Sequence, residues 1–101
     1  MAKFVQIIEY STTKEKRDEM DKLTDEWLAA TEGRRTAGRA VSTSDRDKPN
    51  TYVDIIEFPS YDEAMKNNDL PETGAFAEKS SKLCDGPVTF RNLDVLRIDE
   101  D

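Results

Sequence analysis

Three short apolar runs constrain what this chain can fold into more than any other feature of its sequence. They lie at residues 4–10, 52–58 and 88–98, and the first two are apolar on both faces of an alternating pattern. Such runs are typical of β-strands, and strands that are apolar on both faces belong in a sheet covered on two sides. The rest is polar, because 37% of the 101 residues are charged. The sequence therefore predicts a folded domain with a thin core, whose burial a second copy completes.

A chain of 101 residues corresponds to one domain, so we expect a single domain over residues 1–101. Apolar spacing, caps and turn residues divide it further. The expected elements of the first half are a strand at 4–10, a helix at 14–32 capped by Thr13 and ended by Gly33, and an edge or bulged strand at 35–44. A strand at 51–58, a short helix capped by Ser60 or Asp62 and ending near 67–68, a second helical piece from Pro71, and a strand at 88–98 follow.

This order is β-α-β-β-α-β with the second helix broken in two, which is the ferredoxin-like α+β arrangement. It predicts a four-stranded antiparallel sheet with helices on one face and a bare second face. The strands are too apolar to leave that second face in water. We therefore expect a homodimer in which two sheets stack face to face, as a dimeric α+β barrel.

Charge and cysteine content limit the partners and the compartment. The net charge of −7 opposes binding to nucleic acid phosphates or to an anionic membrane surface. Cys84 is the only cysteine, so no internal disulfide is possible, and residues 1–10 do not form a secretory signal pattern. No apolar run reaches the roughly 18–20 residues that span a bilayer. These features predict a cytoplasmic protein that binds neither nucleic acid nor membrane.

Several segments resemble the antibiotic biosynthesis monooxygenase-like proteins of the dimeric α+β barrel superfamily. The resemblance covers nearly the whole chain and depends on the opening strand Phe4–Tyr10 running into a long helix, on the segment Asp54–Met65, and on residues 67–73 leading into Phe76 and Ala77. It implies the dimeric α+β barrel fold. The superfamily includes cofactor-independent quinone-forming monooxygenases, haem-degrading oxygenases, cyclases and isomerases, so the resemblance leaves the reaction open.

The departures from this family limit the chemistry. Haem-degrading relatives use an axial His, an Asn on the first strand and a Trp at the end of the third strand. This chain has no His, its first strand has no Asn, and Phe58 ends its third predicted strand. The lack of imidazole also removes the commonest general base and most zinc sites. We therefore expect no haem, no other cofactor and no metal, and any catalysis must depend on Asp, Glu, Tyr, Arg or Lys.

Asp54 is the leading candidate for a general base. Asp54 and Glu57 fall on opposite faces of one strand, so one of the two carboxylates points among apolar neighbours. Asp54 shares its face with Tyr52 and Phe58, a mixture that suits an aromatic ligand and a proton acceptor. The alternative is that such a carboxylate is paired with an arginine across the sheet, for example Arg39 or Arg91.

Several other polar and aromatic residues can be interpreted either as structural or as functional. Asn67 and Asn68 lie where many relatives carry a His, and their amides could orient a substrate carbonyl or could simply end the helix. Trp27 belongs to the apolar stripe of the long helix and is expected in the core rather than as a substrate platform. Cys84 precedes an acidic residue, which raises a thiol pKa and opposes a nucleophilic role.

Two functions follow from these residues. The first is a cofactor-independent monooxygenase or related enzyme acting on an aromatic, polyketide-like molecule. Asp54 is its base, Tyr52 and Asn68 are hydrogen-bond donors, and Arg39 stabilises the anion. The second is a non-catalytic dimer, ligand-binding or structural, that has lost the polar site of the family. A cavity beside Asp54 would favour the enzyme, and a filled apolar interior would favour the second reading.

Overall fold

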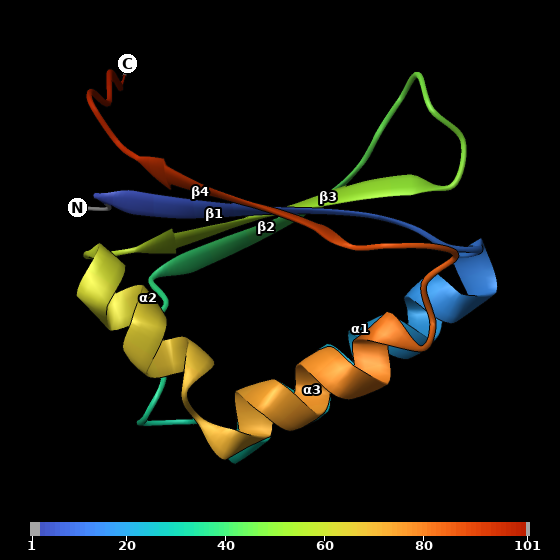
Figure 1. Ribbon diagram of the computed structural model, residues 1–101, viewed down its shortest axis with the longest axis horizontal. Coiled ribbons are helices and arrows are strands. Elements are labelled where there is room, and N and C mark those ends of the chain that lie inside the picture. The colour runs from blue at the N-terminus through green and yellow to red at the C-terminus, as the bar shows by residue number, and fades with distance from the viewer. Residues whose placement is uncertain (1–2, 101) are drawn as a thin grey trace.

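A computed structural model describes residues 3–100 of the chain. Its elements follow the predicted order, including the break in the second helix (Figure 1). They are β1 (Phe4–Ser11), α1 (Lys14–Ala30), β2 (Arg39–Ser44), β3 (Thr51–Phe58), α2 (Tyr61–Asn68), α3 (Pro71–Ser81) and β4 (Thr89–Asp94).

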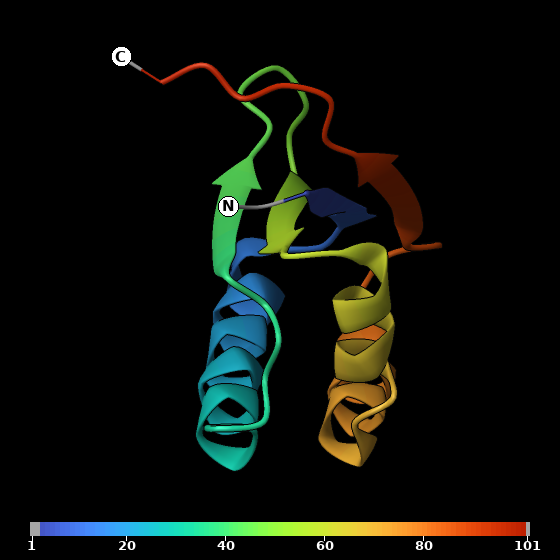
Figure 2. The ribbon, with the colours of Figure 1, turned by 90° about the vertical axis from the view of Figure 1, so that its left-hand side faces the viewer.

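The four strands form one antiparallel sheet in the order β2-β3-β1-β4, and all three helices lie on the same side of it (Figures 1 and 2). The central strand β1 pairs with β3 on one side and with β4 on the other. Ile8, for example, lies opposite Asp54 of β3 and Phe90 of β4. The ferredoxin-like α+β fold predicted from the sequence is confirmed.

Alternation along the strands gives the sheet two different faces. The face toward the helices carries the most buried side chains: Phe4 and Phe58 lie opposite each other and are 2% and 1% exposed, and both pack with Ala64 of α2. None of the helices within residues 3–100 lies over the other face, which we call the open face (Figure 2). Its apolar residues are Val5, Ile7, Val41, Val53, Ile55 and Leu93.

Local side-chain interactions fix the helix ends where the sequence indicated. The Lys16 backbone N–H donates to Thr13 Oγ1 at 3.3 Å, and the Glu63 backbone N–H donates to Ser60 Oγ at 3.1 Å. These hydroxyls satisfy amides that have no partner within the helix. Gly33 has φ +81° in the turn after α1, a conformation that favours glycine.

Two strands are shorter than predicted. The second begins at Arg39 rather than at residue 35, and the last ends at Asp94 rather than at residue 98. Beyond β4, the Val95 backbone N–H still donates to the Lys3 carbonyl at 2.9 Å, but Leu96 is 96% exposed. The segment after β4 and the loop between β2 and β3 both rise on the open side of the sheet (Figures 1 and 2).

Candidate functional site

Asp54 lies on β3 and faces the helices, because it is opposite Ile8 and two residues from Ile56 on the same face. Its side chain is largely buried, and its Oδ1 atom has no hydrogen-bond partner among the described residues. Burial raises the pKa of the Asp54 carboxyl above the usual range, and the positive charge of Arg17 partly opposes that shift. The carboxyl is therefore a stronger base than a solvated one and has an unused acceptor atom.

Two tyrosines flank this carboxyl on the same face of the sheet. Tyr10 and Tyr52 lie opposite each other on β1 and β3, and their rings stack with centroids 5.8 Å apart. The Arg17 guanidinium lies 5.7 Å from the Tyr52 centroid, so α1 covers the pair with a cation. Burial, and then the Asp54 charge, raise the pKa of the Tyr10 phenol, which keeps Tyr10 protonated and able to donate a hydrogen bond.

Arg39 is not part of this cluster. It lies opposite Glu57 on the open face, and its Nε and Nη2 atoms donate to Glu57 Oε2 at 2.9 and 2.6 Å. The carboxylate of β3 that pairs with an arginine across the sheet is therefore Glu57, and Asp54 is the one directed among apolar neighbours. Arg39 and Asp54 are on opposite faces of the sheet and cannot share one site.

Asn68 is also separate from Asp54. It is the last residue of α2 and its side chain is exposed, whereas the preceding Asn67 is 5% exposed. The Asn67 Oδ1 atom accepts a hydrogen bond from the Thr36 backbone N–H at 3.4 Å, which ties α2 to the segment before β2. The buried amide is thus Asn67, in a structural contact. Of the four residues predicted for the site, the structure brings together only Asp54 and Tyr52.

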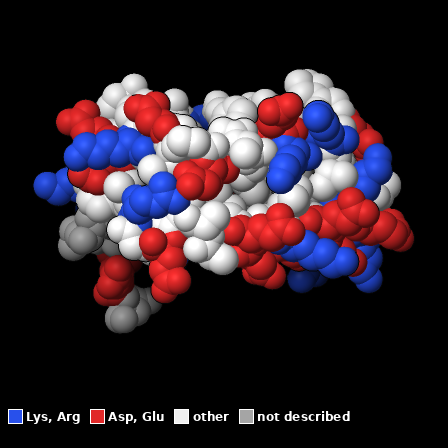
Figure 3. All heavy atoms as spheres, turned by 90° about the horizontal axis from the view of Figure 1, so that it is seen from below, with Lys and Arg blue, Asp and Glu red and all other residues white. Residues whose placement is uncertain are grey.

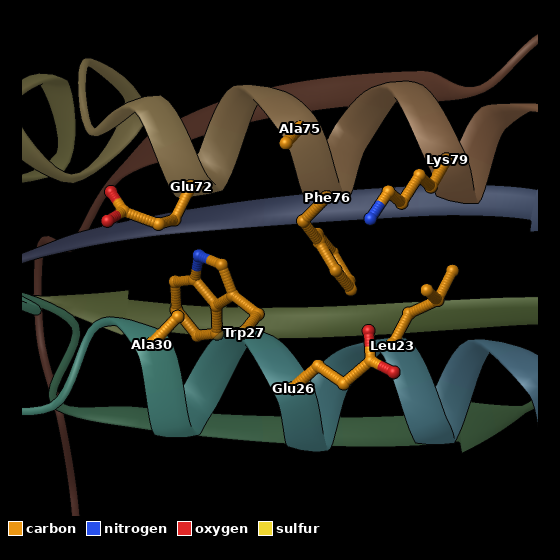
Figure 4. A pocket seen from close by; sticks show the side chains of 8 residues that line it. All are labelled: Leu23, Glu26, Trp27, Ala30, Glu72, Ala75, Phe76 and Lys79. Carbon is orange, nitrogen blue, oxygen red and sulfur yellow. The ribbon is translucent and has the colours of Figure 1, made fainter.

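A groove that the sequence analysis did not predict runs between α1 and α3 (Figure 4). Its volume is about 190 Å³. The apolar lining residues are Leu23, Trp27 and Ala30 of α1 with Ala75 and Phe76 of α3, and the charged ones are Glu26, Glu72 and Lys79. On both helices these residues follow the spacing i, i+3, i+4 and i+7, which places them on one face. That spacing was the available signal, but it does not show which faces meet.

Trp27 is half-buried in this groove, whereas the sequence analysis expected it in the core. Its Nε1 donates to Thr73 Oγ1 of α3 at 2.9 Å, and its ring centroid lies 6.0 Å from that of Phe76. The Arg35 guanidinium lies 5.6 Å from the Trp27 centroid. Trp27 therefore joins α1 to the N-terminal part of α3 through its bond to Thr73, and part of its ring stays accessible.

The groove and the Asp54 carboxyl are distinct features of the structure. Asp54 is not among the groove-lining residues. Arg17, which acts on Asp54, precedes the lining residue Leu23 by six residues of α1, which is about 9 Å of helix. The groove can hold an aromatic ligand between the two helices, and the Asp54 carboxyl lies outside its lining.

Metal-binding and nucleophilic groups are sparse in this structure. Within residues 3–100 there is no cluster of three or more His, Cys, Asp or Glu side chains arranged to hold a metal ion. Burial, and then Asp85, raise the pKa of the Cys84 thiol, which opposes thiolate formation. Over the same residues, none of the helices has the length and apolar character needed to cross a bilayer.

Comparisons with known proteins identify the fold. No family model matches the chain, and no curated protein matches it in sequence. The solved structures that it resembles include a point mutant of SnoaB, a cofactor-independent oxygenase from Streptomyces nogalater, with 14% identity, a TM-score of 0.78 and 97% coverage of both chains. An antibiotic biosynthesis monooxygenase has 15% identity and a TM-score of 0.73, over 93% of this chain and 99% of the other.

A conserved protein from Methanosarcina mazei is equally similar in shape, with 11% identity, a TM-score of 0.78 and 93% coverage of both chains. Identities this low show a shared fold and do not transfer an activity. The resemblance to the antibiotic biosynthesis monooxygenase-like proteins is thus confirmed for the fold of the chain.

Proposed function

We propose that this chain, which has the fold of the antibiotic biosynthesis monooxygenase-like proteins, is a cofactor-independent monooxygenase acting on a small phenolic aromatic molecule. The observation that carries the proposal is the half-buried Asp54 carboxyl on the helix side of the sheet, whose buried Oδ1 atom has no hydrogen-bond partner among the described residues. A buried carboxylate oxygen without a hydrogen-bond partner is costly to stability, and such costs concentrate at functional sites. Tyr10 and Tyr52 beside it supply aromatic surface and phenolic donors.

The chemistry needs only this chain, the substrate and oxygen. Asp54 removes a proton from an activated CH₂ group of the substrate, and the resulting carbanion adds to O₂ to form a peroxide anion. The proton on Asp54 returns to the terminal oxygen, and loss of water leaves a carbonyl group. One O₂ is consumed, one oxygen atom stays in the product and the other leaves as water. The protein contributes the base, a fixed orientation and the exclusion of water.

The proposal gives Asp54 the role of base and Tyr52, with Tyr10, the role of hydrogen-bond donor to the developing anion. Arg17 holds positive charge over the same cluster and favours negative charge on the substrate. Arg39 and Asn68 have no role in it, because one lies on the open face and the other is exposed at the end of α2.

We also propose that the protein acts as a homodimer through its open face. Six apolar side chains lie on that face without a covering layer, and a contiguous apolar surface of this kind is typical of an interface. The loop between β2 and β3 and the segment after β4 rise on the same side, where they would flank a partner sheet. Stacking two such sheets would add the burial that the thin core lacks.

One observation favours a non-catalytic function. The groove between α1 and α3 does not include Asp54 among its lining residues, so it could hold a ligand without any chemistry. In that case the burial of the Asp54 carboxyl would lower the stability of the fold without serving a reaction. Oxygen consumption distinguishes the two functions.

The test is oxygen uptake with 1,8-dihydroxyanthrone, a phenolic molecule with an activated CH₂ group, measured against the reaction without protein. We expect Asp54→Asn to lower kcat by about 100-fold or more, because a positioned base contributes that much. Asp94→Asn, the same change at an exposed position of β4, should leave the rate unaltered. Uptake no faster than without protein, or equal uptake by both variants, would overturn the assignment of Asp54 and favour the non-catalytic function.

A further inference from the structure

Two carboxylates compete for one arginine on the helix side of the sheet. Arg17 of α1 is the cation whose charge acts on Asp54, and the carboxylates that act on Arg17 in turn are those of Asp21 and Asp54. The Arg17 side chain is only 14% exposed, so water screens its charge incompletely. The carboxylate that binds this guanidinium becomes the weaker base of the two.

The structure gives the guanidinium to Asp21. Arg17 Nη1 donates to Asp21 Oδ1, one turn further along α1, and no other oxygen among residues 3–100 accepts a hydrogen bond from the guanidinium. The Asp21 side chain is 62% exposed, whereas Asp54 is half-buried and its Oδ1 atom has no hydrogen-bond partner in the same part of the chain. Burial alone would favour the opposite pairing, because an ion pair is stronger where water is excluded.

Two contacts hold the Arg17 side chain at once. Residues four apart lie on the same side of a helix, so the Asp21 carboxylate reaches Arg17 without any change of the backbone. The guanidinium also lies 5.7 Å from the centroid of the Tyr52 ring. Tyr52 is two residues from Asp54 on the same face of β3, which is about 7 Å along the strand. Arg17 is therefore held beside the Asp54 cluster while it is bonded to another acid.

The remaining titratable groups around Asp54 are neutral at neutral pH. Burial, and then the Asp54 charge, raise the pKa of Tyr10 of β1. Cys84, which acts on Tyr10 from the segment after α3, has a thiol pKa raised by burial and then by Asp85. Over the outer surface of the helices, acidic and basic side chains are mixed and have no single sign (Figure 3). The charged groups that act on Asp54 are therefore Arg17 and Asp21.

We infer that Asp21 is a positioning residue, which holds the Arg17 guanidinium over Tyr52 and thereby leaves the Asp54 carboxylate free to act as a base. The guanidinium then stays available to the anion that forms on the substrate. Without Asp21, Asp54 is the remaining carboxylate that acts on Arg17, and an ion pair between them would occupy both the base and the cation. This inference rests on the proposed function, because it concerns the base of that reaction.

The test follows the Asp54 carboxyl itself, by ¹³C NMR of the full chain labelled at the aspartate carboxyl carbons. Its signal is the one that Asp54→Asn removes, and its titration requires no substrate. Asp21→Asn should move the midpoint of this titration to lower pH by about one pH unit, because Arg17 then pairs with Asp54. Asp21→Glu keeps a carboxylate on the same turn of α1 and should retain the wild-type midpoint.

Two further variants separate positioning from the charge of Asp21 alone. Asp25→Asn removes the same charge at an exposed position one turn further along α1 and should leave the midpoint unchanged. Arg17→Met removes the cation, and in that background the effect of Asp21→Asn should be largely lost. Circular dichroism verifies that each variant is folded. An unmoved midpoint in Asp21→Asn, a midpoint at higher pH, or the same shift with and without Arg17 would overturn the inference.

Oxygen uptake provides a second readout and separates this inference from the proposed function. In Asp21→Asn the rising part of the kcat/KM profile should move to lower pH, and its plateau should fall by about threefold or more, because a weaker base removes a proton more slowly. A shifted Asp54 midpoint in a protein that consumes no oxygen would refute the monooxygenase and leave the role of Asp21 standing. Oxygen uptake that requires Asp54 but has the same pH profile in Asp21→Asn and wild type would refute the role of Asp21 and leave the monooxygenase standing.

Discussion

The rings of Tyr10 and Tyr52 stack at a centroid distance of 5.8 Å, directly across β1 and β3. This pair lies one step along the same face from Asp54, so the stacked rings form one wall beside the buried carboxyl. Because α1 places the Arg17 guanidinium over Tyr52, the wall is covered by a cation rather than by an aliphatic layer. The stacked rings of Tyr10 and Tyr52 and the Arg17 guanidinium thus lie on the same side of the sheet as the Asp54 Oδ1 atom, which has no hydrogen-bond partner among the described residues.

Removing the charge of Asp54 should stabilise the protein near neutral pH. Burial raises the pKa of Asp54 in the folded state, so the folded protein binds more protons than the unfolded chain between the ordinary and the raised pKa. Stability from this group is therefore greatest below the ordinary pKa and falls as pH rises through the raised one. At pH 7 the free energy of unfolding of Asp54→Asn, measured by urea titration, should exceed that of wild type by on the order of 1 kcal/mol. The difference from wild type should shrink toward pH 4, and a difference independent of pH would contradict the pKa shift.

The same pKa shift predicts the pH dependence of activity. Only the carboxylate form of Asp54 accepts a proton, so kcat/KM for oxygen uptake should rise with pH through the raised pKa and then level off. Asp54→Glu should retain part of the activity and a similar rising profile. Rates that are flat over the titration range of carboxyl groups would show that another group is the base.

Two glycines should respond in opposite ways to substitution by alanine. Gly33 has φ +81°, so Gly33→Ala should lower the free energy of unfolding by about 1 kcal/mol. Gly74 lies inside α3, and apart from its chain neighbours and its own helix backbone a Cβ atom there meets no described atom within 4 Å. Gly74→Ala should therefore raise stability by about 0.5–1 kcal/mol. Urea titration of the two variants gives both signs, and a loss of stability in Gly74→Ala would indicate that another chain covers that position.

The link between the two long helices should be measurable as a coupling energy. Thr73→Val removes the acceptor of the Trp27 Nε1–H bond and should cost about 1 kcal/mol. In Trp27→Phe, which has no donor, the same Thr73→Val change should cost less. A double-mutant cycle by thermal unfolding isolates the interaction, and additive losses would show that this hydrogen bond contributes nothing.

Self-association should depend on the open face and not on the outer surface of α1. Ile55→Glu places a charge at the middle of that face and should shift the protein to a monomer in sedimentation velocity. Leu28→Glu makes the same chemical change at an exposed position of α1 and should leave the association unchanged. A wild-type protein that sediments as a monomer would refute the dimer itself.

The fold and one half of the site could be predicted from the sequence because both depend on short-range rules. Alternation along β3 was enough to place Asp54 with Tyr52 and away from Glu57. The position of Arg39 depends on the register between β2 and β3, which the sequence does not specify. Asn67 and Asn68 are adjacent, and only the rotation of α2 decides which of them is buried.

The groove could not be predicted for a similar reason. Each of α1 and α3 shows its apolar stripe in the sequence, and Trp27 was accordingly expected in the core. Whether two stripes bury each other fully or leave a space depends on how far apart the helices lie. The hydrogen bond from Trp27 Nε1 to Thr73 Oγ1 joins the two helices at one end, and Lys16 of α1 forms an ion pair with Asp85, beyond the end of α3; both contacts join residues distant in the chain.

The position of β1 in the middle of the sheet also determines when this protein can fold during its synthesis. β1 is made before the other three strands of its sheet, and its second edge stays unoccupied until β4, whose Asp94 pairs with Phe4, is available. Until residues 89–94 leave the ribosome, β1 exposes unpaired backbone groups next to apolar side chains. Completion of the sheet must therefore follow release of residues 89–94, and the nascent form, with one open edge beside β1, is the species most exposed to aggregation.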